Sequence, residues 1–122
     1  LNLVPPTSSG YSEANRLRTS LLLGQATTLP QLAAAFSSIQ AADLPPETLA
    51  HYNVDILSRA VETISAHGPD PKAYFGGIPA TLKSLRPRLE VAYRELAKYA
   101  PNTISHNQLI DLANAQRRWS LL

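Results

Sequence analysis

Apolar residues recur at every third or fourth position through most of the chain, and prolines separate the stretches in which they do so. Proline is tolerated in the first turn of a helix but disrupts a helix interior, so we expect the prolines to mark helix boundaries. They lie at positions 5, 6, 30, 45, 46, 69, 71, 79, 87 and 101. No stretch of the sequence alternates apolar and polar residues with β-branched enrichment, so the pattern predicts no strands.

This spacing predicts five helices joined mostly by short loops. The predicted helices are 10–23, a second that begins near Thr28 and Pro30 and ends at 43–45, a third over 46–66, a fourth from about 85–87 to just before Pro101, and a fifth after Thr103 that ends before Trp119. Thr28 and Thr103 are the expected N-caps of the second and fifth helices.

The third predicted helix carries the broadest apolar face, which is typical of a helix covered on two sides. That face consists of Leu49, Tyr52, Ile56, Ala60 and Ile64, widened by Val54, Leu57 and Val61. The expected inward positions of the fourth are Leu85, Leu89, Ala92, Leu96 and Tyr99, and those of the fifth are Leu109, Leu112, Ala113 and Gln116.

Residues 68–84 form a long connection rich in proline and glycine, from which Tyr74, Phe75 and Ile78 are expected to fold back onto the helices. The elements together predict an all-α fold of antiparallel helical hairpins, and a single helical domain over residues 1–122. Because the chain opens on Leu1 and contains no methionine, we expect it to be a C-terminal fragment of a longer protein.

One sequence interval matches a known repeat. Tyr11 and Pro45 lie 34 positions apart and bracket a helix, a turn and a second helix, which is the period of a tetratricopeptide unit. The tryptophan and the glycine–tyrosine pair of that motif are missing from the interval, so a plain helical bundle stays open beside a tetratricopeptide-like array.

The C-terminal third, "LRPRLEVAYRELAKYAPNTISHNQLIDLANAQRRW", resembles the end of the actinobacterial protein kinase G family. The matching positions are Leu89, Glu90, Tyr93, Arg94, Leu96, Ala97, Leu109, Asp111, Ala113, Asn114, Arg117, Arg118 and Trp119, while Ala115 and Gln116 depart from the family pattern. The opening "VPPTSSGYSEA" is similar to a junction between that family's repeats. The resemblance implies a serine/threonine kinase with a rubredoxin-like segment, a kinase core and a helical tail that assists dimerisation and organises substrates.

The sequence itself carries no motif for catalysis. It has no kinase glycine loop, H-R-D or D-F-G motif, and it has no cysteine, which excludes disulfides and a rubredoxin-like metal site. His51 and Asp55 lack a third metal ligand in the sequence pattern, and Ser65, His67 and Asp70 lack the elbow motif of a hydrolase. We therefore predict no catalytic, metal-binding or cofactor-binding residue and no cofactor in this segment.

Charge also limits the classes of partner. Eleven lysines and arginines against nine acidic residues give a net charge of +2, too mild for a strong field toward nucleic acid or a membrane surface. No apolar run reaches the roughly 18 to 20 residues that span a bilayer, and we expect a cytoplasmic protein. Three arginines have partners at helical spacing, in Glu13–Arg16, Asp55–Arg59 and Glu90–Arg94.

The sequence therefore predicts a non-catalytic interaction or regulatory module. Its expected partners are proteins: its own kinase core, a second subunit in a homodimer, or a substrate protein. The candidate partner-binding residues are Arg86, Arg88, Arg94, Arg117 and Arg118, for which an ordinary solvated surface is the alternative. A free-standing helical adaptor that binds a peptide or a partner protein is the alternative function.

Overall fold

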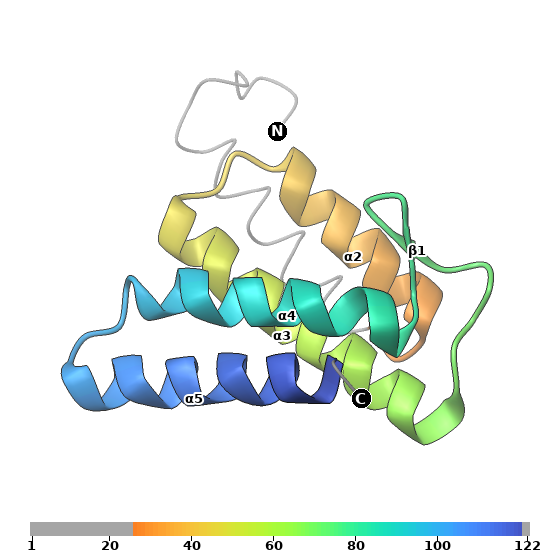
Figure 1. Ribbon diagram of the computed structural model, residues 1–122. Coiled ribbons are helices and arrows are strands. Elements are labelled where there is room, and N and C mark those ends of the chain that lie inside the picture. Colours follow the sequence, from red (N-terminus) through yellow and green to blue (C-terminus); the bar gives the residue numbers. More distant parts are fainter. Residues whose placement is uncertain (1–25, 121–122) are drawn as a thin grey trace, which may run out of the picture.

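The computed structural model describes residues 26–120 (Figure 1). The predicted helix 10–23 and the Glu13–Arg16 pair lie outside these residues. The described part comprises α2 (Leu29–Ala41), α3 (Pro46–His67), α4 (Leu82–Ala97) and α5 (Thr103–Ser120), with two short strands, β1 (Tyr74–Phe75) and β2 (Ile78–Pro79), between α3 and α4. The predicted all-α class is confirmed, with a small hairpin added.

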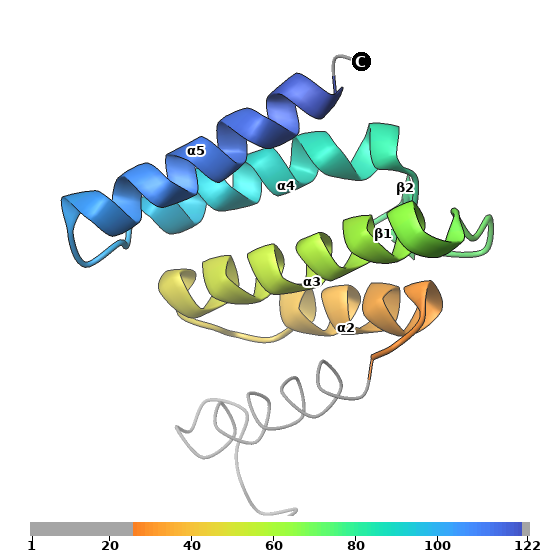
Figure 2. The same ribbon diagram turned by 90° about the horizontal axis from the view of Figure 1, so that it is seen from below.

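The helices form a layered array in which each packs on its neighbours in sequence. α2 lies against α3, α3 against α4, and α4 against α5, and successive helices run in opposite directions (Figures 1 and 2). This sequential packing is the arrangement of a helical-repeat protein. Within the described residues no helix is both long enough and apolar enough to span a membrane.

α2 begins where the sequence predicted it would. The Thr28 hydroxyl accepts a hydrogen bond from the Gln31 backbone N–H at 3.4 Å, and the Gln31 side-chain oxygen accepts one from the Thr28 backbone N–H at 3.2 Å. This reciprocal capping box satisfies two backbone donors at the start of the helix, and Pro30 in the first turn has no N–H that needs an acceptor.

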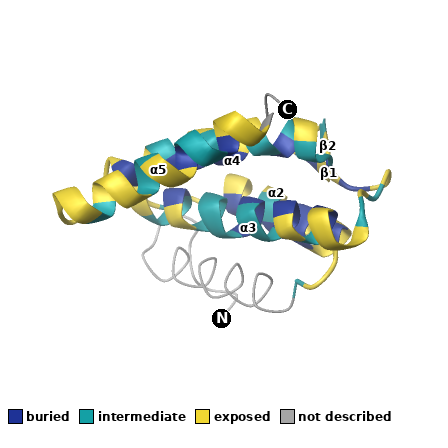
Figure 3. Cartoon of the chain, turned by 60° about the horizontal axis from the view of Figure 1, so that its bottom comes forward, coloured by how far each residue is buried: buried dark blue, intermediate teal, exposed yellow. Residues whose placement is uncertain are grey.

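α3 is the central helix, and its broad apolar face is buried from two sides as expected. Ile56 and Ala60 are fully buried, and Leu57, Val61 and Ile64 are nearly so. Figure 3 shows buried positions where α3 meets its neighbours, whereas α5 carries mostly exposed positions. α5 packs on α4, so one side of it stays open in the described structure.

The predicted start of α4 at 85–87 is wrong, because the helix begins at Leu82 and contains Pro87. Thr81 sets this start: its hydroxyl accepts a hydrogen bond from the Ser84 N–H at 3.2 Å, and its carbonyl accepts one from the Leu85 N–H at 2.8 Å. Pro87 has no backbone N–H, so one carbonyl of the preceding turn has no helical partner. Because Pro87 is exposed, that carbonyl lies near solvent.

The predictions for α5 need three corrections. Its N-cap is Asn102 rather than Thr103, because the Asn102 side-chain oxygen accepts a hydrogen bond from the Ser105 N–H at 2.8 Å. Trp119 lies within the helix, not beyond it. Leu112 is 45% exposed rather than inward-facing, whereas Ala113 and Gln116 are buried as expected.

The connection between α3 and α4 contains the antiparallel β1–β2 hairpin, which contradicts the prediction of no strands. Two-residue strands are too short to show alternation, and Gly76 and Gly77 form the turn with positive φ angles of 60° and 82°. Phe75 folds back as predicted, with its ring edge-on to Phe36 at 5.7 Å between centroids. Tyr74 instead remains about half exposed.

Candidate partner-binding cleft

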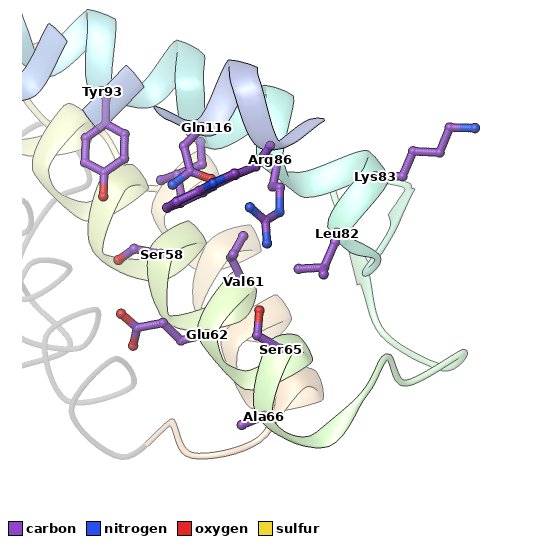
Figure 4. Close-up of a pocket in the computed structure, with 12 residues that line it drawn as sticks. Ser58, Val61, Glu62, Ser65, Ala66, Leu82, Lys83, Arg86, Tyr93 and Gln116 are labelled. Atoms are coloured by element: carbon purple, nitrogen blue, oxygen red, sulfur yellow. The ribbon is translucent and has the colours of Figure 1, made fainter. Parts of the chain in front are cut away.

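A cleft of about 1170 Å³ opens between α3 and α5, and α4 forms its floor (Figure 4). We call it the α3–α5 cleft. On the α3 wall Ser58, Glu62 and Ser65 follow one another at helical spacing, so they share one face. Since the buried side of α3 meets α2 and α4, this polar face is left for the cleft.

The floor combines apolar and basic side chains from α4. Leu82, Arg86, Leu89 and Tyr93 are spaced by four, three and four residues and therefore share one side of the helix. Leu89 is buried and Arg86 is half-buried, while Lys83 is exposed beside them at the end of the cleft. A ligand in the cleft would contact an apolar floor with positive charge at one end.

The α5 wall contributes Gln116 and Trp119. The Arg86 guanidinium carbon lies 5.1 Å from the centroid of the Trp119 ring, a distance at which cation and ring attract each other. Trp119 is nevertheless 52% exposed. A large aromatic surface is therefore presented at the rim of the cleft.

Gln116 is the one buried polar or charged residue of the described chain, with 6% of its surface exposed. Its side chain points from α5 into the cleft (Figure 4), and its Oε1 atom has no hydrogen-bond partner among the described residues. A buried oxygen without a donor costs about 1 to 3 kcal/mol. A donor supplied by a bound partner would remove that cost.

Tyr93 and Glu62 interact across the cleft. Burial raises the pKa of the Tyr93 hydroxyl above its ordinary value of 10.0, and the negative charge of Glu62 raises it further. The hydroxyl therefore stays protonated at neutral pH and can donate or accept a hydrogen bond.

A smaller hollow of about 540 Å³ lies between the same three helices, toward the other end of α4. Glu47 and His51 come from α3, Tyr99 follows α4, and Leu109 and Leu112 come from α5. One carboxylate and one imidazole from α3 therefore face a side that includes the apolar residues Leu109 and Leu112.

The five candidate arginines are placed in different surroundings. Arg86 lines the cleft, and Arg94 is paired with Glu90 at 2.9 Å and with the Asn114 side-chain oxygen at 2.8 Å. Arg88 is exposed on another face of α4 from Arg86. Arg117 and Arg118 are exposed near the end of α5. A single basic patch made of all five stays a prediction.

Sequence reasoning did not identify Glu62, Lys83, Tyr93 or Trp119 as members of one site. They come from three helices, and helical period does not report which helices share a cleft. Gln116 could have indicated the site from the sequence, because a polar residue at an expected inward position needs a hydrogen-bond partner.

Among residues 26–120 no three His, Cys, Asp or Glu side chains gather in a group that could hold a metal ion. Asp55, one of the two residues considered for a metal, is paired with Arg59 at 3.0 Å. The arrangement of the cleft is suited to contact and hydrogen bonding.

Comparison with known families identifies the region. The model of the family described as protein kinase G tetratricopeptide repeat matches residues 1–120. No curated protein sequence matches the chain. The match covers the helices that form both walls and the floor of the cleft.

Proposed function

Since this chain belongs to the protein kinase G tetratricopeptide repeat family, we propose that it is the interaction module of a protein-kinase-G-like serine/threonine kinase. The resemblance seen in the C-terminal third is thereby confirmed, and the repeat array replaces the plain bundle. Tetratricopeptide regions bind proteins and are not themselves catalytic, so the module holds a protein partner in place. The partner is the kinase core, a second subunit or a substrate.

The observation that carries this proposal is the α3–α5 cleft. Its volume of about 1170 Å³ exceeds the roughly 300–1,000 Å³ of small-molecule pockets. Its rim holds an exposed tryptophan and an arginine, two residue types enriched where proteins bind one another. These features favour a protein segment over a small substrate.

The open side of α5 supports the proposed role in dimerisation. Ile104, Leu112 and Trp119 fall within one side of this helix, and they are 72%, 45% and 52% exposed. Repeat arrays bury such faces against the next unit or a partner. A second subunit or the kinase core would cover this row of side chains.

The test is calorimetric titration of the chain with the kinase core encoded by the same gene. We expect Trp119→Ala to weaken binding by more than about tenfold, because truncated tryptophans at interfaces commonly cost 2 kcal/mol or more. Tyr74→Ala is the matched control, since Tyr74 is also 52% exposed but lies on the β-hairpin.

Equal effects of the two substitutions would contradict the proposed surface. A gene that encodes no kinase core would contradict the assignment to a kinase and leave the free-standing adaptor.

A further inference from the structure

We propose that the α3–α5 cleft binds an extended peptide segment of the partner, in which an acidic side chain meets Arg86 at the positively charged end of the cleft and a neighbouring apolar side chain meets Trp119. This inference rests on the proposed function, because it names the part of the protein partner that enters the cleft. It is carried by an unpaired buried oxygen, by unpaired cations and by the charge on the opposite wall.

The unpaired oxygen is Oε1 of Gln116, which is buried and directed into the cleft. It can only accept a hydrogen bond, so the ligand has to bring a donor. An extended peptide carries backbone N–H groups that are free to donate, whereas those in the interior of a helix are already used. The donor requirement therefore favours an extended segment over a helical one.

The cations define the ligand's charge. Arg94 on α4 is paired with Glu90, and Lys98, the residue after α4, is paired with Glu95. Within residues 26–120, Lys83 and Arg86 form no ion pair with a carboxylate. Arg86 is held over the Trp119 ring, which leaves the edge of its guanidinium free to donate two parallel hydrogen bonds to a carboxylate.

The α3 wall of the cleft limits how much negative charge the peptide can carry. Glu62 lines the cleft from α3 with its carboxylate on the Tyr93 side, away from Arg86, and the Lys83 side chain points outward at the opposite end (Figure 4). A segment with carboxylates along its whole length would be repelled by Glu62, whereas one acidic residue beside apolar ones satisfies both walls. Between them, the half-buried Leu82 offers an apolar side chain for the adjoining residue, with the buried Val61 and Leu89 beside it.

The experiment uses a random-peptide phage library panned against the chain, followed by synthetic copies of the selected peptides. Trp119 is the single tryptophan of the sequence, so its intrinsic fluorescence reports occupation of the cleft without a label. We expect selected peptides to contain one Asp or Glu next to an apolar residue, and to change the Trp119 emission as they bind. Replacing the acidic residue of the peptide by its amide should weaken binding by about tenfold or more.

Two variants on α4 provide the matched comparison, because they make the same charge change two residues apart. Arg86→Glu should weaken the peptide by about tenfold or more, and Arg88→Glu, on another face, should leave its affinity within about twofold. Since Arg86→Glu also removes the contact with Trp119, Lys83→Glu is the second test, and thermal unfolding confirms that each variant folds. Glu62→Gln should strengthen binding of the acidic peptide, as it removes a repelling charge.

The inference is overturned if selected peptides lack acidic residues, if the variants of Arg86 and Arg88 behave alike, or if no peptide changes the Trp119 emission. Emission that changes with chain concentration alone would assign the cleft to a second copy instead. If peptides fail but the kinase core still binds in a Trp119-dependent manner, the proposed function stands and only the peptide inference falls.

Discussion

The side chains of Arg86 and Trp119 join the first turns of α4 to the last turn of α5, with the guanidinium carbon 5.1 Å from the ring centroid. The contact belongs to the α3–α5 cleft, because both residues line it. It also holds a cation and an aromatic ring side by side at the rim, where a partner would meet them together.

This contact makes a prediction for stability. Arg86→Ala should lower the free energy of unfolding by about 0.5–1 kcal/mol, the usual range for a cation–π contact at an exposed site. Arg88→Ala should change it by less than about 0.5 kcal/mol, as is typical of surface substitutions. Urea unfolding followed by circular dichroism measures both, and equal values would show that the contact contributes nothing.

Substitution of Gln116 should change the stability of the chain and its affinity for the peptide in opposite directions. Gln116→Leu keeps the size of the side chain and removes an unpaired buried oxygen, so it should stabilise the free chain by about 1 kcal/mol. The same substitution should weaken binding of the acidic peptide, because the ligand's donor loses its acceptor. Urea unfolding and Trp119 fluorescence titration give the two values. A loss of stability would mean that the amide is already satisfied in the free protein.

The corrected N-cap of α5 can be tested directly. Asn102→Ala should destabilise the chain by about 1 kcal/mol, because the Ser105 N–H loses the side-chain acceptor at 2.8 Å. Thr103→Ala should have a smaller effect, since Thr103 is the first residue of the helix and not its cap. Thermal unfolding of the two variants measures which substitution destabilises the chain more. A larger effect of Thr103→Ala would identify Thr103 as the cap.

The raised pKa of Tyr93 predicts that the folded chain loses stability at alkaline pH. Its pKa is raised in the folded chain, first by burial and then by Glu62, so the folded state keeps the proton longer than the unfolded state does. Its contribution to stability is therefore complete below pH 10 and is lost as the pH rises through the folded-state pKa. Urea unfolding across this range should show a smaller alkaline loss for Tyr93→Phe than for the unchanged chain.

The exposed Tyr74 serves as the control for that series. Tyr74→Phe should retain the alkaline loss of the unchanged chain. If Tyr93→Phe retained it as well, the buried phenol would not be the group responsible.

Features fixed by neighbouring residues were predictable from the sequence. The Thr28 cap with Pro30 in the first turn depends on three or four consecutive positions, and the broad face of α3 depends on a long regular period. Pro87 misled the prediction because the helix begins farther upstream, after the Thr81 cap, and its buried face at Leu85 and Leu89 runs on both sides of the proline. The β1–β2 hairpin was not predicted, because strands of only two residues are too short to show an alternating pattern.

The cleft lay beyond what periodicity can predict. Glu62, Arg86 and Trp119 are far apart in sequence and meet only because α3, α4 and α5 stack in order. The pattern of α5 placed Leu112 inward, although the helix packs on α4 and leaves that side open. Which faces of a helix are covered depends on the number of its neighbours, and one helix's own sequence does not state that number.

The most direct test of the α3–α5 cleft as the partner-binding surface is hydrogen–deuterium exchange of the chain with and without the kinase core that the proposed function assigns to its gene. Binding is predicted to protect backbone amides in 58–66, 82–93 and 116–119, and to leave those of the β1–β2 hairpin at 74–79 unchanged. Protection confined to the hairpin or to α2, with none along the walls and floor of the cleft, would contradict it.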